Sequence, residues 1–309
     1  MAYIICALAS ARKNGFTASI MKAVTAKLEN TQNVEVGVLY LHDYDFGPCR
    51  SCFSCIRNPG GGCVRDDDWG RKGEGILYKA MKRANGLMIF DPVYFAGTSA
   101  MGRLFLERIY PLMWEGVSQG LPFASVSCAG NQGFQLVATE EYCKFAAAAG
   151  LRYVGGIPAH IAYLEEATTQ AIEMSLRLAE AALEDERSGR KPLTDEELFR
   201  NYMDTPFDFV DCYLENLTAG TFDPELSIPV MLASRKGLEN PEAQDLLLKC
   251  CDSLKETLDL YTAGERDTVP PMLSKTAKLW TNAMLMEYGG RLLDGDVPDI
   301  NHYRPLDNA

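Results

Sequence analysis

The chain has 309 residues, of which 47% are hydrophobic, and it carries ten cysteines and a formal net charge of −12. This length suits one large domain or a domain with an extension, and the hydrophobic content supports a sizeable core. The negative charge argues against nucleic acid or an anionic membrane as a partner, and no apolar stretch approaches the roughly 20 residues that span a bilayer. No basic region with a cleavage site precedes the first apolar run, so we expect no signal peptide and a cytoplasmic location.

The first half of the chain alternates short apolar runs, typical of buried strands, with stretches of helical spacing. We expect five strands, at residues 3–8, 34–40, 86–90, 123–128 and 153–157. We expect helices among them at residues 17–28, 75–84, 102–113 and 133–149. This β-α repetition predicts a parallel, doubly wound sheet with right-handed crossovers, in which ligands bind at the carboxyl ends of the strands.

The loop after the first strand, Ala9–Thr17, leads small and hydroxyl residues into a helix N-terminus. Free N–H groups and the helix dipole favour a phosphate there, and Ser10, Arg12 and Thr17 can add donors and charge. A plain turn with Thr17 as the N-cap is the alternative. The loop matches neither G-x-G-x-x-G nor the Walker A pattern, which disfavours a conventional dinucleotide or nucleoside triphosphate site.

Four cysteines follow the second strand, spaced C-x2-C-x2-C-x7-C, namely Cys49, Cys52, Cys55 and Cys63. The return to the fourth cysteine is residues 59–62, Pro-Gly-Gly-Gly, which bend at little steric cost. Four thiolates suit a [4Fe–4S] cluster or zinc, and the tight C-x2-C-x2-C run is closer to cluster ligation. A run that stays reduced without metal, or that forms disulfides, is the remaining alternative.

Two later loops also follow predicted strands. Residues 91–99 offer a proline, two aromatic residues and several small residues, and such a segment can wrap an aromatic ring system. Residues 127–133 are again small and polar. Each loop alone could be a packed turn, but three such loops at strand ends favour one site for a planar cofactor.

From about Leu164 the pattern becomes helical. The charged stretch 184–191 indicates an exposed helix end and a linker. Further helices are expected at residues 195–203, 206–217, 241–260 and 273–286. We therefore expect a domain at residues 1–190, with the cysteine loop at 46–65, and an α-helical C-terminal extension at 191–309.

Three segments together resemble a known superfamily. They are Ser10-x-Arg12-Lys13-Asn14-Gly15-x-Thr17, Pro48–Cys63 followed by Asp66-Asp67, and Pro92-Val93-Tyr94-Phe95 with the helix ending Phe105-Leu106-Glu107-Arg108. They resemble the flavodoxin-like NADPH-dependent FMN reductase superfamily, and within it the iron–sulfur flavoproteins. The resemblance covers roughly residues 1–185 and implies a flavodoxin-like, five-stranded α/β sheet. It also implies a homodimer or homotetramer in which the cysteine loop approaches a neighbour's flavin.

The resemblance further implies an FMN-dependent oxidoreductase in which a [4Fe–4S] cluster on the four cysteines passes electrons between the flavin and a one-electron carrier or small-molecule acceptor. Ferredoxin or NAD(P)H would be the electron donor. The residues implied to hold FMN are Ser10, Arg12, Asn14, Gly15, Phe16, Thr17, Pro92, Val93, Tyr94, Phe95, Ala129, Gly130, Asn131 and Gln132. No catalytic acid or base is indicated. The alternatives are a cluster-free NAD(P)H-dependent reductase of flavins, quinones, nitro compounds or another organic substrate, and a zinc-stapled flavodoxin-like binding module.

Overall fold

The computed structural model describes residues 1–130, 133–203, 209–235 and 237–294. The chain divides into two compact units, Met1–Pro192 and Leu193–Ala309. Among the described residues, no helix is both long enough and apolar enough to cross a membrane.

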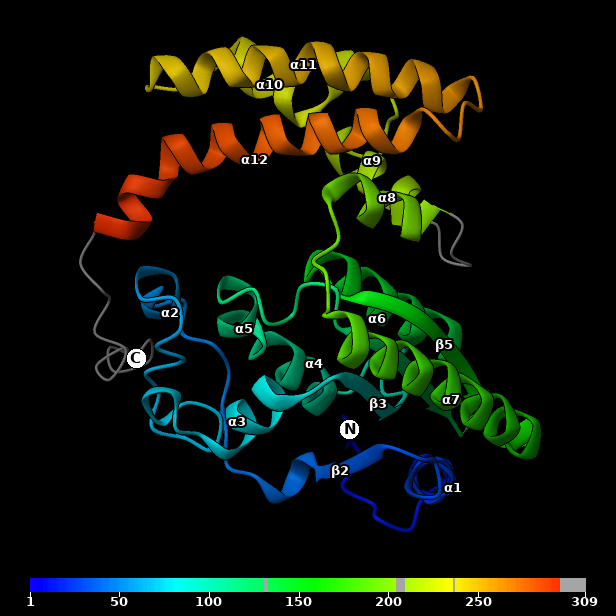
Figure 1. Cartoon of the computed structure of the whole chain (residues 1–309). Helices are drawn as coiled ribbons and strands as arrows, with labels where there is room; N and C mark the ends of the chain where they lie inside the picture. The colour runs from blue at the N-terminus through cyan, green and yellow to red at the C-terminus, as the bar shows by residue number, and fades with distance from the viewer. Residues whose placement is uncertain (131–132, 204–208, 236, 295–309) are drawn as a thin grey trace, which may run out of the picture. The chain divides into compact units, whose positions relative to one another are not determined.

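The first unit is built on a five-stranded sheet in which all neighbouring strands are parallel, in the order β2-β1-β3-β4-β5. Figure 1 labels β2, β3 and β5 of this sheet. The strands are β1 (Ala2–Leu8), β2 (Val34–Tyr40), β3 (Gly86–Pro92), β4 (Pro122–Ala129) and β5 (Arg152–His160). This is the flavodoxin-like strand order, so the predicted fold class is confirmed. Every predicted strand lies within the observed one.

Helices cover both faces of this sheet. The helices of the first unit are α1 (Phe16–Glu29), α2 (Ser54–Arg57), α3 (Ile76–Arg83), α4 (Ala100–Glu107), α5 (Tyr110–Trp114), α6 (Gln135–Ala148) and α7 (Leu164–Ser188). On one face α1 and α7 share a hydrophobic core with the strands, through residues such as Ile20, Leu178 and Phe90. On the other face the ring of Tyr142 in α6 lies 6.4 Å from that of Phe123 in β4. Every residue of β3 and β4 is buried as a result, which explains why apolar residues predominate in both strands.

One predicted helix was wrong. The stretch expected as a single helix at 102–113 forms two helices, α4 and α5, with a break at Arg108 and Ile109. Pro111 lies in the first turn of α5, where its missing N–H does no harm. In a continuous helix its ring would instead clash with the carbonyl of Glu107, so the chain turns at this point.

The second unit is all-helical, as predicted. Its helices are α8 (Asp195–Met203), α9 (Phe209–Leu217), α10 (Ile228–Arg235), α11 (Pro241–Thr262) and α12 (Val269–Asp294). The sequence did not predict α10, and residues 206–208 of the predicted helix 206–217 lie outside the described residues.

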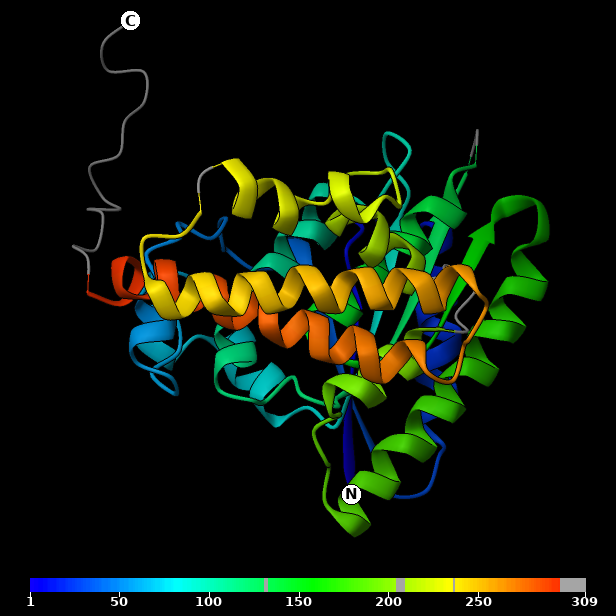
Figure 2. The same ribbon diagram turned by 90° about the horizontal axis from the view of Figure 1, so that it is seen from above.

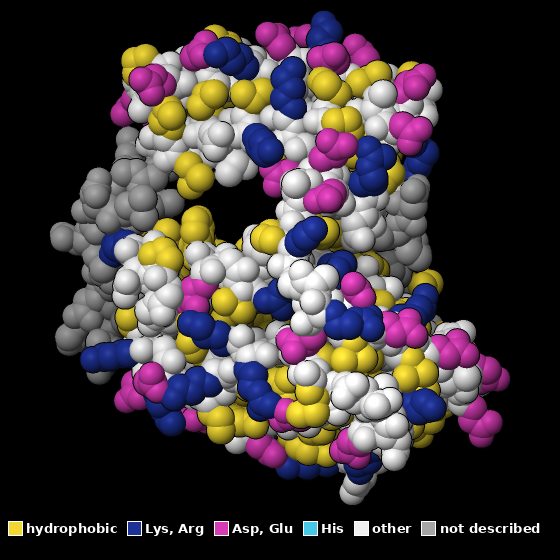
Figure 3. All heavy atoms as spheres, in the orientation of Figure 1, with side chains coloured by type: hydrophobic (Ala, Val, Ile, Leu, Met, Phe, Trp, Pro, Cys, Tyr) yellow, Lys and Arg dark blue, Asp and Glu magenta, His cyan; other side chains and the backbone are white. Residues whose placement is uncertain are grey.

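Helices α11 and α12 lie side by side in both ribbon views (Figure 1, Figure 2). Asn240 caps α11 by accepting hydrogen bonds from the N–H groups of Glu242 and Ala243, at 2.9 and 3.2 Å. Acidic and basic side chains are interspersed over the visible face of this unit (Figure 3). This mixture is what the outer faces of solvated amphipathic helices carry.

Candidate functional site

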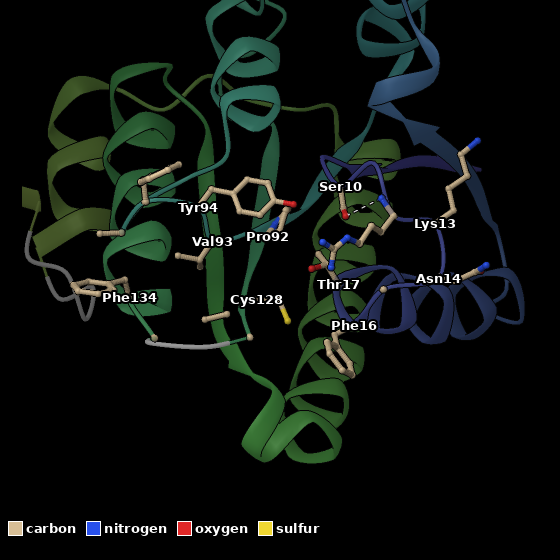
Figure 4. Close-up of a pocket in the computed structure, with 17 residues that line it drawn as sticks. Ser10, Lys13, Asn14, Phe16, Thr17, Pro92, Val93, Tyr94, Cys128 and Phe134 are labelled. Atoms are coloured by element: carbon tan, nitrogen blue, oxygen red, sulfur yellow. Dashed lines mark hydrogen bonds between the residues drawn. The ribbon is translucent and has the colours of Figure 1, made fainter.

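A large cavity opens at the carboxyl ends of β1, β3 and β4, with a volume of about 1330 Å³ (Figure 4). It is lined by Ser10, Arg12, Lys13, Asn14, Gly15, Phe16, Thr17, Pro92, Val93, Tyr94, Phe95, Ala96, Cys128, Ala129, Gly130, Gly133 and Phe134. The set contains every predicted flavin-binding residue except Asn131 and Gln132, which lie outside the described residues. The structure therefore brings the three predicted loops together, and their contact with a cofactor stays a prediction.

The loop after β1 forms one wall of the cavity. Ser10 and Thr17 are only 6% and 5% exposed, and the Oγ of Ser10 accepts a hydrogen bond from the N–H of Arg12 at 3.1 Å. The N-cap of α1 is Gly15, not Thr17 as the alternative interpretation of this loop proposed. Glycine has no side-chain oxygen, so it leaves the N–H groups of the first turn for an anionic ligand.

The loop after β3 forms the opposite wall and makes a tight turn. Tyr94 and Gly97 pair through two backbone hydrogen bonds of 3.1 and 3.2 Å, and the central residues Phe95 and Ala96 both have positive φ. A bulky residue in this conformation is strained, and Phe95 is also fully exposed. The strained turn holds an aromatic ring at the cavity where nothing else in the described chain covers it.

Asp91 fixes the two ends of this loop. The carboxylate is fully buried and accepts hydrogen bonds from the N–H of Ser99, at 2.8 Å, and from the hydroxyl of Ser99, at 2.5 Å. Burial raises the pKa of Asp91 to about 6, although the two bonds from Ser99 oppose the shift. The same hydroxyl accepts from the N–H of Gly102 and so caps α4.

Cys128, which belongs to the predicted loop at 127–133, also lines the cavity, as does Phe134, which the sequence did not assign to it. Cys128 is 5% exposed, and burial raises the pKa of its thiol, an effect that the hydroxyl of Thr17 partly offsets. Phe134 and Tyr94 are each 49% exposed, and Phe16 is 55% exposed. Aromatic rings thus surround the mouth of the cavity.

The four predicted metal ligands line a second cavity, of about 270 Å³. The cysteine loop is tightly bent, with positive φ at Ser51, Phe53, Gly60 and Gly62. All ten cysteines are free thiols. Among the described residues, no group of three or more His, Cys, Asp or Glu side chains is arranged to hold a single metal ion.

The thiols of this cavity are close enough to influence one another. Burial raises the pKa of Cys55 to about 11, and Cys63, Cys49 and Cys52 each raise it further. Burial likewise raises the pKa of Cys49, partly offset by the N–H of Ser51. A cationic centre bound in this cavity would favour the thiolate forms of Cys49 and Cys55, against the burial that opposes them.

Two consecutive residues at the end of α4 anchor the cysteine loop. Glu107 accepts a hydrogen bond from the N–H of Cys49 at 2.5 Å. Arg108 donates to the carbonyl of Gly47 at 2.5 Å and to the sulfur of Cys63 at 3.4 Å. No anchoring role was predicted for these two residues, because their position depends on the helix break before Pro111.

Asp67 completes this anchor. It accepts hydrogen bonds from Arg108 at 2.7 and 3.0 Å and from Arg65 at 2.9 Å, and the Arg108 side chain is 1% exposed. Burial alone would raise the pKa of Asp67, but the bonds from Arg108 and from the N–H of Gly70 outweigh it and hold the pKa well below its usual range. The pair is therefore a buried ion pair with both charges satisfied.

Residues 3–161 match the family model of the NADPH-dependent FMN reductases. The chain belongs to this family. This membership confirms the superfamily that the three sequence segments resemble, and it supports the flavin-dependent oxidoreductase class and the cofactor FMN that the resemblance implies.

Two curated relatives carry a more specific description. Over 104 residues the chain is 32% identical to an iron–sulfur flavoprotein of Methanocaldococcus jannaschii, a match that covers 33% of this chain and 49% of the relative. Over 104 residues it is 26% identical to an iron–sulfur flavoprotein of Archaeoglobus fulgidus, covering 34% and 44%. The chain thus spans about half the length of the curated relatives that it matches.

Solved structures are similar over about 60% of the chain. An NADH:FMN oxidoreductase has a TM-score of 0.43 at 16% identity, covering 60% of this chain and 90% of that one. A WrbA-like flavodoxin from Agrobacterium tumefaciens has a TM-score of 0.37 at 12% identity, covering 59% and 99%.

Proposed function

We propose that this family member is an FMN-dependent oxidoreductase in which a [4Fe–4S] cluster, held by Cys49, Cys52, Cys55 and Cys63, exchanges electrons with the flavin. The observation that carries the proposal is that one compact unit contains both a large cavity at the strand ends and a second cavity lined by all four cysteines. FMN accepts electrons in pairs and releases them singly, whereas a cluster carries one electron at a time. The names of the two archaeal relatives support the same assignment.

At the large cavity, the chain's residues would divide the work of holding FMN. The buried hydroxyls of Ser10 and Thr17, the charge of Arg12 and the first turn of α1 would bind the phosphate. The loops at 92–95 and 129–130 would line the isoalloxazine ring. This set fits the cofactor, because polar donors gather at one wall of the cavity and apolar side chains at the other.

The proposed function needs an electron donor and an electron acceptor. NADPH or NADH would supply the electrons, in line with the family's description, and a one-electron carrier such as ferredoxin or a small organic molecule would exchange them at the other end. The exposed rings of Phe16, Tyr94, Phe95 and Phe134 around the cavity support a homodimer or homotetramer that covers them.

The test is an absorption spectrum of anaerobically purified protein, with FMN, iron, sulfide and zinc measured on the same sample. We expect one FMN with about four irons and four sulfides per chain. Iron and sulfide should be lost from Cys55→Ser while FMN is retained, because the two cavities are separate. Cys251→Ser is the matched control, since this cysteine lies on α11 in the second unit.

Each other outcome selects a different function. FMN without iron or sulfide would select the cluster-free reductase, whose organic substrate the aromatic rings at the cavity mouth would contact. Stoichiometric zinc in a colourless protein would select the zinc-stapled binding module. Protein without flavin under all conditions would contradict the proposal as a whole.

A further inference from the structure

We propose that Arg108 is a positioning residue for the cysteine cavity, and that its hydrogen bond to Cys63 raises the reduction potential of the cluster bound there. This inference rests on the proposed function, because it needs the cluster. Arg108 is not one of the four ligands, and Asp67 offsets most of its positive charge.

The side chain of Arg108 contacts both ends of the cysteine loop. Arg108 bonds to the carbonyl of Gly47, just before the first cysteine, and to the sulfur of Cys63, the last one. Both ends of the cysteine loop are therefore tied to the same guanidinium group. Its planar fork of five N–H donors allows this, because donors remain for other partners after two are committed to Asp67.

The guanidinium group of Arg108 is also held rigidly. The Arg108 side chain is 1% exposed. Its guanidinium carbon lies 5.9 Å from the centroid of the fully buried Trp69 ring. Trp69 is in turn held edge-on against Phe105 of α4, at 5.3 Å. Arg108 cannot turn to solvent without breaking this packing, so its donor stays aimed at the sulfur.

The charge of Arg108 is balanced as well. Asp67 contacts Arg108 through both carboxylate oxygens and offsets most of its positive charge. What Arg108 offers Cys63 is then mainly a hydrogen bond, not a free cation. A donor to a cluster sulfur stabilises the reduced form, which carries more negative charge, and so raises the potential.

Two substitutions should move the potential in opposite directions. Arg108→Met removes the donor to Cys63, and we expect the reduction equilibrium to shift about tenfold toward the oxidised form, about 59 mV for one electron. Asp67→Asn leaves the donor and exposes the sulfur to the uncompensated charge of Arg108, so we expect a shift toward the reduced form. A mere loss of packing would move both variants in the same direction.

The measurement is an anaerobic spectroelectrochemical titration of the cluster in the full chain, with iron, sulfide and FMN content measured on each variant. Arg65→Met is the matched control, because Arg65 also binds Asp67 but donates to the carbonyl of Pro48 in place of a sulfur. Its midpoint should stay closer to that of the natural protein than the midpoint of Arg108→Met does.

The outcomes separate this inference from the function beneath it. If the unaltered protein holds no iron or sulfide, the proposed function fails and the inference falls with it. If the cluster is present and Arg108→Met leaves its potential unchanged, only the inference is overturned. If Arg108→Met does not accumulate with its iron, Asp67→Asn decides: a shift toward the reduced form supports the role of Arg108, and an unchanged or lower potential contradicts it.

Discussion

A single buried carboxylate, that of Asp91, joins the two ends of a loop that lines the large cavity. Asp91 holds Ser99 from the end of β3, and both bonds join the start of the 92–98 segment to its end. A buried carboxylate favours its neutral form, which explains why its pKa rises from 3.8 to about 6. The folded protein therefore binds a proton in a pH range where the unfolded chain has released it.

This difference makes the stability depend on pH with a definite sign. Between about pH 4 and pH 6 the free energy of unfolding should fall as the pH rises, because the folded state must give up the proton it holds more tightly. The loss is complete about one pH unit above the raised pKa and amounts to roughly 3 kcal/mol, of which about a third has occurred by pH 4.5. Asp91→Asn does not titrate, so the variant should gain on the natural protein by roughly 2 kcal/mol between pH 4.5 and pH 7.5.

Urea unfolding of the FMN-free protein at pH steps across this range would measure the effect. Asp66→Asn is the control, because the Asp66 side chain is 98% exposed. This variant should show the same pH dependence of unfolding as the natural protein. Parallel pH curves for Asp91→Asn and the natural protein would show that Asp91 ionises normally in the folded state.

At the residue scale, the sequence predicted which side chains line the large cavity because each lies directly after a buried strand. The anchors of the cysteine loop were not predictable in the same way. From the sequence alone, the three aspartates at 66–68 are typical of a helix N-cap, yet α3 begins only at Ile76 with Gly75 as its N-cap. The carboxylate of Asp67 pairs with Arg108, 41 residues further along the chain, and no local pattern encodes that contact.

At the scale of elements, α4 joins the two cavities. Its N-cap is Ser99, at the end of the loop that lines the large cavity, and Glu107 and Arg108 at its other end contact the cysteine loop. Helix α4 has eight residues and is therefore about 12 Å long. A shift of α4 would move residues that contact both cavities.

Gly102 shows how tightly this helix is packed. A methyl group at this position would collide with the hydroxyl of Tyr142 and lie 3.0 Å from the carboxyl carbon of Asp91. Alanine is better than glycine in a helix by about 1 kcal/mol, but overpacking costs about 1–3 kcal/mol. We expect Gly102→Ala to lower the free energy of unfolding by about 1 kcal/mol, and to weaken FMN binding through the displaced cap at Ser99.

A double-mutant cycle with Tyr142→Phe tests the stated cause. Removing the hydroxyl should relieve the collision, so the double variant should be more stable than the sum of the two single effects predicts. Unfolding free energies of the four proteins give the coupling energy directly. Additive effects would mean that the added methyl group is accommodated without touching Tyr142.

The elements themselves were predicted unequally. The central strands β1, β3 and β4 were found because predominantly apolar runs mark strands buried on both faces. The break between α4 and α5 was missed, although Pro111 marks it, because the apolar spacing continues across the turn. Helix α10 was missed because eight residues with a proline second in the run are too few to show helical spacing.

At the scale of the whole molecule, the first unit contains everything that the proposed function uses. Both cavities, the complete sheet and the residues that match the family lie within Met1–Pro192. The segment after α7, which ends this unit, is hydrogen-bonded to the rest of it. Arg190 donates to the carbonyl of Val117 at 2.8 Å and to that of Ala84 at 3.3 Å, so the segment after α7 is bound to the unit that it ends.

A chain of residues 1–192 should therefore fold and bind FMN with a dissociation constant close to that of the full chain, and should carry the same iron per chain. A chain of residues 1–188 is the matched control. It lacks Arg190 and should be less stable by about 2 kcal/mol, because two hydrogen bonds from a charged donor are lost. Thermal unfolding and FMN titration of both chains measure this.

If residues 1–192 fold but bind no FMN, the second unit contributes to the flavin site. If they bind FMN normally and lose only turnover, the second unit serves the substrate, because the cofactor sites would then be complete without it.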